Sequence, residues 1–147
     1  PLSFASGLLE EKASIVPTSY CALRRRVLQG EVHDENCAAL AGVSGHAGLF
    51  GSGENVVIFL RAFWCTKEAQ RLLSWSQQGL FCGWRPGNTK TPSVFAQGGA
   101  FGHFGFTGCA FWVDPKTSDF LIFLTNRVRY SRVSSSFDQA RQLVFKK

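Results

Sequence analysis

A glycine-rich aromatic run at residues 101–108 has the clearest chemical meaning in this sequence. It reads Phe101-Gly102-His103-Phe104-Gly105-Phe106-Thr107-Gly108 and is followed by apolar stretches over 109–113 and 120–125. Because side chains alternate along a strand, His103 and Gly105 share a face, where the missing side chain leaves room for a ligand beside an imidazole that titrates near neutral pH. The run predicts a strand of a buried hairpin against which a substrate could bind. A twisted core strand with a hydrogen-bonded histidine is the alternative.

Two polar loops hold the other side chains capable of chemistry. The first reads Gly30-Glu31-Val32-His33-Asp34-Glu35-Asn36, and its spacing matches no metal-ligand motif, so a hydrogen-bonded turn is favoured over a metal site or an acid–base pair. The second reads Gly42-Val43-Ser44-Gly45-His46, which departs from the G-x-S-x-G nucleophile elbow at its last position and follows no predicted strand. A tight glycine turn is therefore favoured over a Ser44 nucleophile. His33, Asp34 and His46 remain candidate residues of a cleft loop.

The elements that must position these residues form an α+β pattern. Residues 1–52 are predicted to be irregular, with one short helical piece near 20–28. Apolar residues at helical spacing predict helices over 53–75, with Ser52 as the cap, and a closing helix over 134–145. Strands are predicted over 80–84, 101–107, 109–113 and 119–125, with a loop over 85–99. We therefore expect one domain, 1–147, in which an antiparallel sheet within 80–126, three C-terminal strands plus one earlier, packs with helices.

Composition bounds the class of protein. The 147 residues are 45% hydrophobic and 14% aromatic, enough for one sizeable core and too apolar for a disordered chain. Five widely spaced cysteines form no C-x-x-C pair, so no disulfide framework and no zinc site is indicated, and no metal or other cofactor is predicted. The net charge of +6 arises from clusters such as 24–26 without an accompanying stacking motif. A solvated surface is favoured over nucleic-acid binding.

The hydropathy of the sequence bears on membrane insertion and on secretion. No apolar run reaches the about 18 residues of a spanning helix, and residues 1–4 lack the basic start and apolar core of a secretion signal. The default expectation is a cytoplasmic chain without a membrane span, although a truncated start would have lost an export signal.

Five ordered motifs carry a family resemblance. They are Gly30–Asn36, Gly45–Phe50, Phe101–Gly108, Trp112–Pro115 and Leu124–Arg127. In this order and spacing they resemble the C-terminal half of the class C β-lactamase-like serine hydrolases, a superfamily of β-lactamases, penicillin-binding carboxypeptidases and related esterases. The resemblance covers about residues 28 to 132 and implies a partial β-lactamase/transpeptidase-like fold.

The resemblance also implies an acyl-transfer site. In that family a serine in S-x-x-K attacks a carbonyl, a Tyr or Ser motif shuttles protons, and a K-T-G-like strand flanks the substrate. His103 would take the lysine position of an H-F-G version and is the implied catalytic residue. Gly105 and Phe106 would contact the substrate, with the Phe106 backbone N–H as an oxyanion donor. Phe104 stands where a small hydroxyl residue is expected.

The nucleophile of that family is absent from the sequence. No serine has lysine three positions on, and neither Tyr20 nor Tyr130 begins a Y-x-N motif. The family places both motifs N-terminal to the matched segment, so the chain is expected to be a C-terminal fragment or a truncated descendant.

Several functions follow from this pattern. The first hypothesis is a truncated β-lactamase-related protein without acyl-transfer activity of its own, whose exposed apolar sheet face favours self-association. The second is a serine hydrolase, esterase-, β-lactamase- or peptidase-like, that acts on an acyl or peptidoglycan-like substrate only with a missing N-terminal half. The others are an enzyme in which Ser44 or a cysteine attacks with His46 or His103 as base, and a non-catalytic binding module.

Overall fold

A four-stranded antiparallel sheet is the centre of the fold. The computed structural model describes residues 2–4, 12–80, 85–86, 100–130, 132–133 and 136–145. The strands lie in the order β5-β6-β7-β8, with bounds Arg85–Pro86, Phe101–Phe104, Ala110–Val113 and Phe120–Phe123. All neighbouring pairs are antiparallel. The predicted α+β class is confirmed, with three C-terminal strands and one earlier strand. The earlier strand is β5 at Arg85–Pro86, where the sequence pattern predicts the start of a loop over 85–99. Residues 81–84 of the predicted strand and 87–99 of the predicted loop lie outside the described residues.

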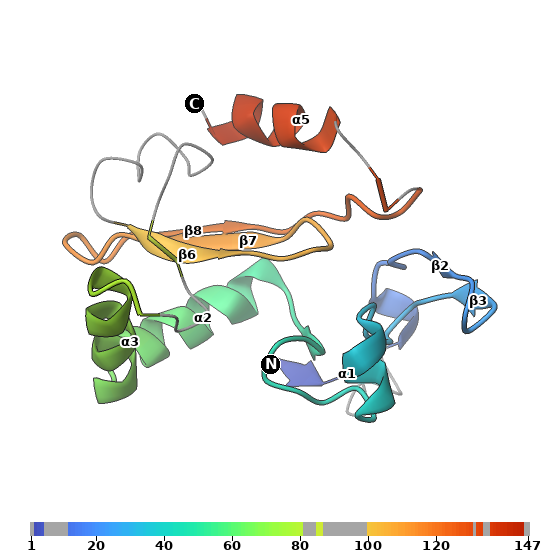
Figure 1. Cartoon of the computed structure of the whole chain (residues 1–147), viewed down its shortest axis with the longest axis horizontal. Coiled ribbons are helices and arrows are strands. Elements are labelled where there is room, and N and C mark those ends of the chain that lie inside the picture. The colour runs from blue at the N-terminus through green and yellow to red at the C-terminus, as the bar shows by residue number, and fades with distance from the viewer. Residues whose placement is uncertain are drawn as a thin grey trace.

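Helices cover both faces of this sheet (Figure 1). Helices α2, Gly53–Trp64, and α3, Lys67–Gln77, lie below it, and α5, Ser136–Phe145, crosses above it. Ser52 caps α2 as predicted: its hydroxyl accepts the Asn55 N–H, and the Asn55 side chain accepts the Ser52 N–H. These reciprocal bonds satisfy donors that the first turn of a helix leaves open.

Strand alternation divides the core into two clusters. On the face toward α2 and α3, Phe101 and Val113 pack with Trp64 and Ala69. The other cluster contains Ala100 and Trp112, with Phe104 and Leu121 packed against it. Neighbouring residues of one strand thus contribute to opposite layers, which follows from the two-residue repeat of a strand. The fold therefore places Phe104 in a core layer opposite that of Phe101.

Short strand pairings hold the described residues that precede α2. Strand β1, Ser3–Phe4, pairs with β4, Leu49–Phe50, and β2, Tyr20–Cys21, pairs with β3, Arg26–Val27. A 3-10 turn, η2, spans Lys12–Ser14, and helix α1 spans Glu35–Ala39. The short helix expected near 20–28 is wrong: the segment is an antiparallel hairpin. Its ladder continues through two backbone bonds, Thr18 N–H to Leu28 O and Leu28 N–H to Ser19 O, and Arg25 takes a turn conformation with φ +52°.

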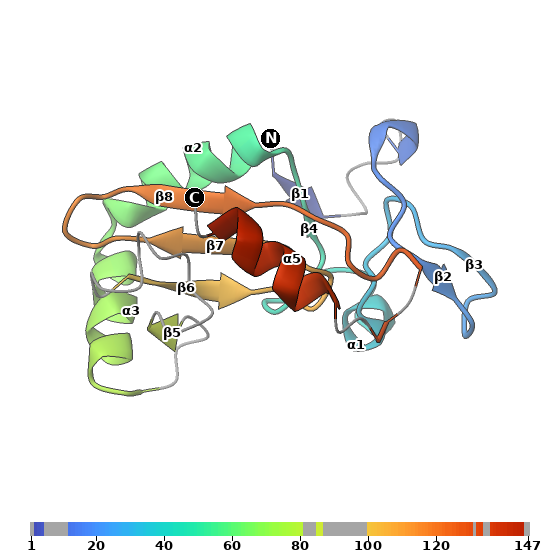
Figure 2. The same cartoon turned by 90° about the horizontal axis from the view of Figure 1, so that it is seen from above.

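A side-chain amide ties this N-terminal region to the sheet. The Nδ2 group of Asn126 donates to the backbone oxygens of Pro17 and Thr18, both at 2.8 Å. Asn126 lies just after β8, so these two bonds hold the β2–β3 hairpin at the end of the sheet where β8 ends. Figure 2 shows the hairpin projecting at this end.

Exposed apolar side chains gather away from the covered sheet faces. Those most open to solvent are in the β2–β3 region and the segment after β8: Val16, Leu23, Tyr130 and Val133. Self-association through an exposed sheet face stays a prediction. Among the described residues, no helix has the length and apolar character needed to cross a bilayer.

Candidate functional site

The turn that joins β6 to β7 is the structural centre of the predicted site. The Gly105 N–H donates to Cys109 O at 2.7 Å, and the Gly108 N–H donates to Gly105 O at 3.0 Å. Gly108 has φ +110°, a conformation that favours glycine, and a Cβ there would lie 2.7 Å from Thr125 Oγ1. A Cβ on Gly105 would lie 3.3 Å from Cys109 O. The glycines therefore permit a tight turn. Gly105 lies in this turn, after the end of β6, and not on the strand face of His103 where the sequence pattern predicts it.

The Phe106 side chain is held from two directions. Its ring stacks on His33 with centroids 5.7 Å apart, and the Arg127 guanidinium carbon lies 4.5 Å from its centroid. Arg127 also donates through Nε to Phe106 O, and its own backbone N–H donates to Thr107 O at 2.9 Å. A cation over a ring face and a charge-assisted hydrogen bond both favour one position of the turn. The structure thus brings the first polar loop to the end of β6.

His103 lies on β6, opposite Phe111 of β7 in the register, and its side chain is exposed. Gly102, its neighbour in β6, has less space for a side chain than Gly105 has. A Cβ on Gly102 would lie 2.1 Å from Phe111 O and 2.9 Å from Trp112 Cα, both backbone atoms of β7. Close approach of the two strands therefore requires glycine at this position.

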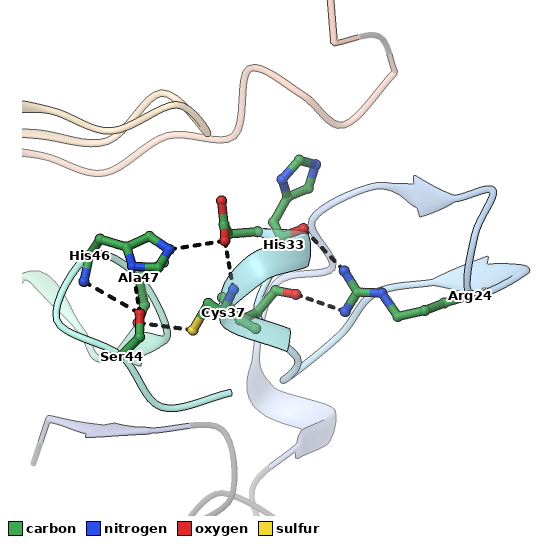
Figure 3. Close-up of polar contacts among 8 residues, drawn as sticks. Arg24, His33, Cys37, Ser44, His46 and Ala47 are labelled. Carbon is green, nitrogen blue, oxygen red and sulfur yellow. Dashed lines mark hydrogen bonds and ion pairs between the residues drawn. The ribbon is translucent and has the colours of Figure 1, made fainter. Parts of the chain in front are cut away.

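The second side-chain constellation links the two polar loops (Figure 3). Asp34 is the N-cap of α1, and its Oδ1 accepts the Cys37 N–H at 2.7 Å. The same oxygen lies 3.1 Å from His46 Nε2, and His46 Nδ1 lies 2.8 Å from Ser44 Oγ. The structure therefore joins Asp34 to His46, as it joins His33 to Phe106.

Charged neighbours surround the buried His33. Only 7% of this residue is exposed, and its Nε2 has no hydrogen-bond partner among the described residues. Burial lowers the pKa of His33, and the positive charge of Arg132 lowers it further, while Glu35 opposes the shift. Glu35 itself is ion-paired with Arg132, which lowers the pKa of the carboxyl. His33 is thus held neutral near pH 7.

Two arginines contribute contacts that sequence patterns did not assign. Arg127 belongs to a matched motif, Leu124–Arg127, for which the sequence assigns no role to the arginine; its place just beyond the end of a predicted strand is the available signal. Arg24 was expected on a solvated surface, yet it donates to Val32 O at 2.8 Å and His33 O at 3.1 Å. These bonds fix the backbone just before α1. In the part of the chain that the structure describes, no group of three or more His, Cys, Asp or Glu is arranged to hold a metal ion.

We expect His33 to make stability depend on pH below about 6.5. An unfolded histidine titrates near that value, whereas the pKa of folded His33 is lowered. Between the two values the unfolded chain binds more protons than the folded chain, so the free energy of unfolding falls as pH decreases through this window. Above it, His33 contributes no pH dependence. Urea unfolding followed by tryptophan fluorescence from about pH 7 to about pH 5.5 measures the slope.

The matched variant is His33→Phe, which keeps an aromatic ring against Phe106 and cannot be protonated. It should flatten the slope in that window. Asp34 and Glu35, whose pKa values are also lowered, cause a loss of stability only at more acidic pH, near and below the usual carboxyl range of about 4. A slope that persists unchanged in His33→Phe would assign the effect to other groups.

Comparison with known proteins finds relatives of part of this chain. It is 34% identical to a Bacillus subtilis protein named N-acetylmuramyl-L-alanine amidase, over 71% of this chain and 28% of that protein. It is 32% identical to Salmonella agona and Salmonella enteritidis proteins named D-alanyl-D-alanine carboxypeptidase, with the same coverage. No protein-family model matches the chain, and no solved structure does. The chain spans less than a third of the length of these relatives, and over most of its own length it is similar to proteins named as an amidase and as carboxypeptidases.

Proposed function

We propose that this chain forms one wall of the acyl-transfer site of a peptidoglycan-related serine hydrolase of the β-lactamase-like class. Two observations on the sequence support the proposal. The matched proteins carry names that specify N-acetylmuramyl-L-alanine and D-alanyl-D-alanine, both of which contain amide bonds of the bacterial cell wall. The ordered motifs of the sequence resemble the half of the serine hydrolase fold that flanks the substrate.

The position of the Phe106 backbone N–H is the observation that carries this proposal. It lies in the turn after β6, and within the described residues it donates to no backbone acceptor. His33 and Arg127 hold the Phe106 ring, and Arg127 holds its carbonyl. An oxyanion donor must be positioned before the reaction, because reorganisation during it would offset the stabilisation. A fixed turn with an available N–H meets this requirement.

The chemistry assigned to this wall follows from acyl transfer. A serine oxygen attacks the amide carbon, and negative charge develops on the carbonyl oxygen, which accepts the Phe106 N–H. His103 lies on the strand that leads to this turn, at the lysine position of the K-T-G-like motif, where an imidazole can exchange a proton near neutral pH. The serine of S-x-x-K is absent from this sequence. The attacking group therefore belongs to a further segment or a second chain.

A chimeric enzyme tests this function. The Bacillus subtilis relative would carry this chain in place of its own matched segment, and hydrolysis of a muropeptide containing N-acetylmuramyl-L-alanine would be measured. We expect turnover, and we expect His103→Ala to lower kcat/KM by about 100-fold or more, the typical contribution of a positioned acid or base. Lys116→Ala, in the exposed β7–β8 turn, is the matched control and should leave turnover unchanged.

The unmodified chain supplies the complementary result. Without the S-x-x-K serine it should give no His103-dependent turnover of muropeptides. A folded chimera that lacks activity, or one whose activity is unaffected by His103→Ala, would contradict the proposed role.

A further inference from the structure

Ser44, His46 and Asp34 form a continuous hydrogen-bonded chain that the function proposed above does not use (Figure 3). Ser44 Oγ lies 2.8 Å from His46 Nδ1, and His46 Nε2 lies 3.1 Å from Asp34 Oδ1. A hydroxyl, an imidazole and a carboxylate in this sequence are the components of a general-base-activated nucleophile. The sequence comparison with G-x-S-x-G missed this arrangement, because the carboxylate comes from the other polar loop.

Asp34 determines which imidazole nitrogen can act as the base. Its carboxylate accepts the Cys37 N–H, which lowers the pKa of Asp34, and the hydrogen bond with His46 lowers it further. An ionised carboxylate only accepts hydrogen bonds, so His46 Nε2 carries the proton in this contact. In neutral imidazole the other nitrogen, Nδ1, then has the lone pair, and it faces Ser44 Oγ. The order of the two nitrogens is the reverse of that in serine proteases, and either nitrogen can accept a proton.

The loop that carries Ser44 is both fixed and accessible. The Cys37 Sγ–H donates to Ala47 O at 3.2 Å, and a Cβ on Gly48 would lie 2.3 Å from Gly42 O, so the loop is closely packed at its base. At its tip, a Cβ on Gly45 would meet no atom within 4 Å. The His46 side chain is 54% exposed, and Ser44 is partly exposed. A small reagent can therefore approach Ser44 from the side of Gly45.

We propose that Ser44 is a nucleophile toward small activated acyl and phosphonyl compounds, with His46 as its general base and Asp34 as the residue that positions His46. In the acyl reaction, Ser44 Oγ forms a bond to the carbonyl carbon and its proton passes to His46 Nδ1. The bond to the leaving group breaks, and the leaving group departs as an anion such as p-nitrophenolate. His46 then releases that proton to solvent, which restores the neutral imidazole. Water attacks the Ser44 ester and gives one proton to His46 Nδ1, which passes it to Ser44 Oγ as the ester bond breaks, so the carboxylic acid and the free serine are released.

The class of substrate follows from what this loop supplies. General-base assistance contributes about 10²–10⁴-fold, far less than a complete hydrolase site with its oxyanion donors. The reaction is therefore assigned to esters and phosphonyl fluorides with good leaving groups, and amide bonds are not expected to react. It uses neither β6 nor the β6–β7 turn, so the proposal does not depend on the muropeptide activity.

A fluorophosphonate probe tests the inference on the chain as it exists. Ser44 Oγ would displace fluoride and form an O–P bond, which intact mass measurement detects as one adduct and peptide mapping assigns to Ser44. Ser44→Ala should abolish labelling, and His46→Gln should slow it by about 100-fold. The matched control is Ser74→Ala, at an exposed position of α3, and it should label at the rate of the unmodified chain.

Asp34→Asn separates positioning from folding. The amide oxygen of the substituted side chain can still accept the Cys37 N–H, because asparagine is as good an N-cap as aspartate, so the urea unfolding midpoint should change little. The labelling rate should fall by about 10-fold, because the amide does not hold the required tautomer of His46. A purely structural contact would leave the labelling rate unchanged in this variant.

Two results would overturn the proposal. One is the absence of an adduct on the folded chain, and the other is an adduct that persists in Ser44→Ala or in urea-unfolded protein. The unmodified chain, labelled with and without urea, tests the inference even where a variant fails to fold. Labelling that depends on the folded loop must disappear when urea unfolds this chain. These measurements are made on the chain alone, so they remain distinct from the outcome of the chimera.

Discussion

Replacing Gly102 with alanine is expected to lower the free energy of unfolding by about 3 kcal/mol or more. The new Cβ would lie 2.1 Å from Phe111 O and 2.9 Å from Trp112 Cα. Both atoms belong to the backbone of β7, so no side-chain rotation relieves the overlap. Strands β6 and β7 would have to separate, and their pairing connects the two core clusters. Since domains are stable by only about 5–15 kcal/mol, this change would remove a large fraction of the total.

Gly45→Ala is the matched control for this prediction. Its Cβ would meet no atom within 4 Å, so it tests the effect of adding a methyl group without the strand overlap. Urea unfolding followed by tryptophan fluorescence should place Gly45→Ala within about 1 kcal/mol of the unmodified chain. Equal midpoints for Gly102→Ala and Gly45→Ala would show that β6 and β7 can adjust to the added Cβ.

Phe104→Thr is expected to lower the free energy of unfolding by about 3 kcal/mol, although it restores the hydroxyl that the K-T-G-like pattern leads one to expect. The Phe104 ring packs on Trp112 with centroids 5.1 Å apart, and the Arg141 guanidinium carbon lies 4.2 Å from its centroid. Arg141 is only 7% exposed. Threonine would leave a cavity beside Trp112 and remove the ring that contacts a buried cation, whose remaining ion pair is with Asp138.

The control for this loss is Phe59→Thr in α2. Phe59 is 44% exposed and stacks on Phe63, so its replacement removes a ring of equal size from a more open position. It should cost about 1 kcal/mol, partly from the lower helix propensity of threonine. Urea unfolding compares the two variants. A Phe104→Thr chain as stable as Phe59→Thr would contradict the structural role assigned to Phe104 and Arg141.

Local sequence patterns predicted much of the fold around residues 52–145. Helix α2 was predictable because its apolar spacing and its cap are encoded in neighbouring residues, with Ser52 and Asn55 three positions apart. The hairpins of the main sheet were predictable for the same reason: alternating or continuous apolar runs on either side of a turn favour antiparallel pairing. The predicted boundaries extend beyond β6 and β8, because pairing ends where the turns begin.

The segment before α1 was not predictable in this way. Its residues near 20–28 suggested a short helix, whereas the structure forms β2 and β3. The hairpin is held by long-range bonds, including those from Asn126 to Pro17 and Thr18. A single sequence contains no local signal for a partner so distant along the chain, and tertiary contacts override weak helical preference.

By itself, the sequence determined the chemical inventory: the imidazoles, carboxylates and glycines, their order, and the resemblance that gives His103 and Phe106 their proposed roles. Only the tertiary structure decided which of these groups meet. It placed His33 against Phe106 and joined Asp34 to His46 and Ser44. The physical reason is that hydrogen bonds and ring contacts act over a few ångströms in space, whereas the motifs record only separation along the chain.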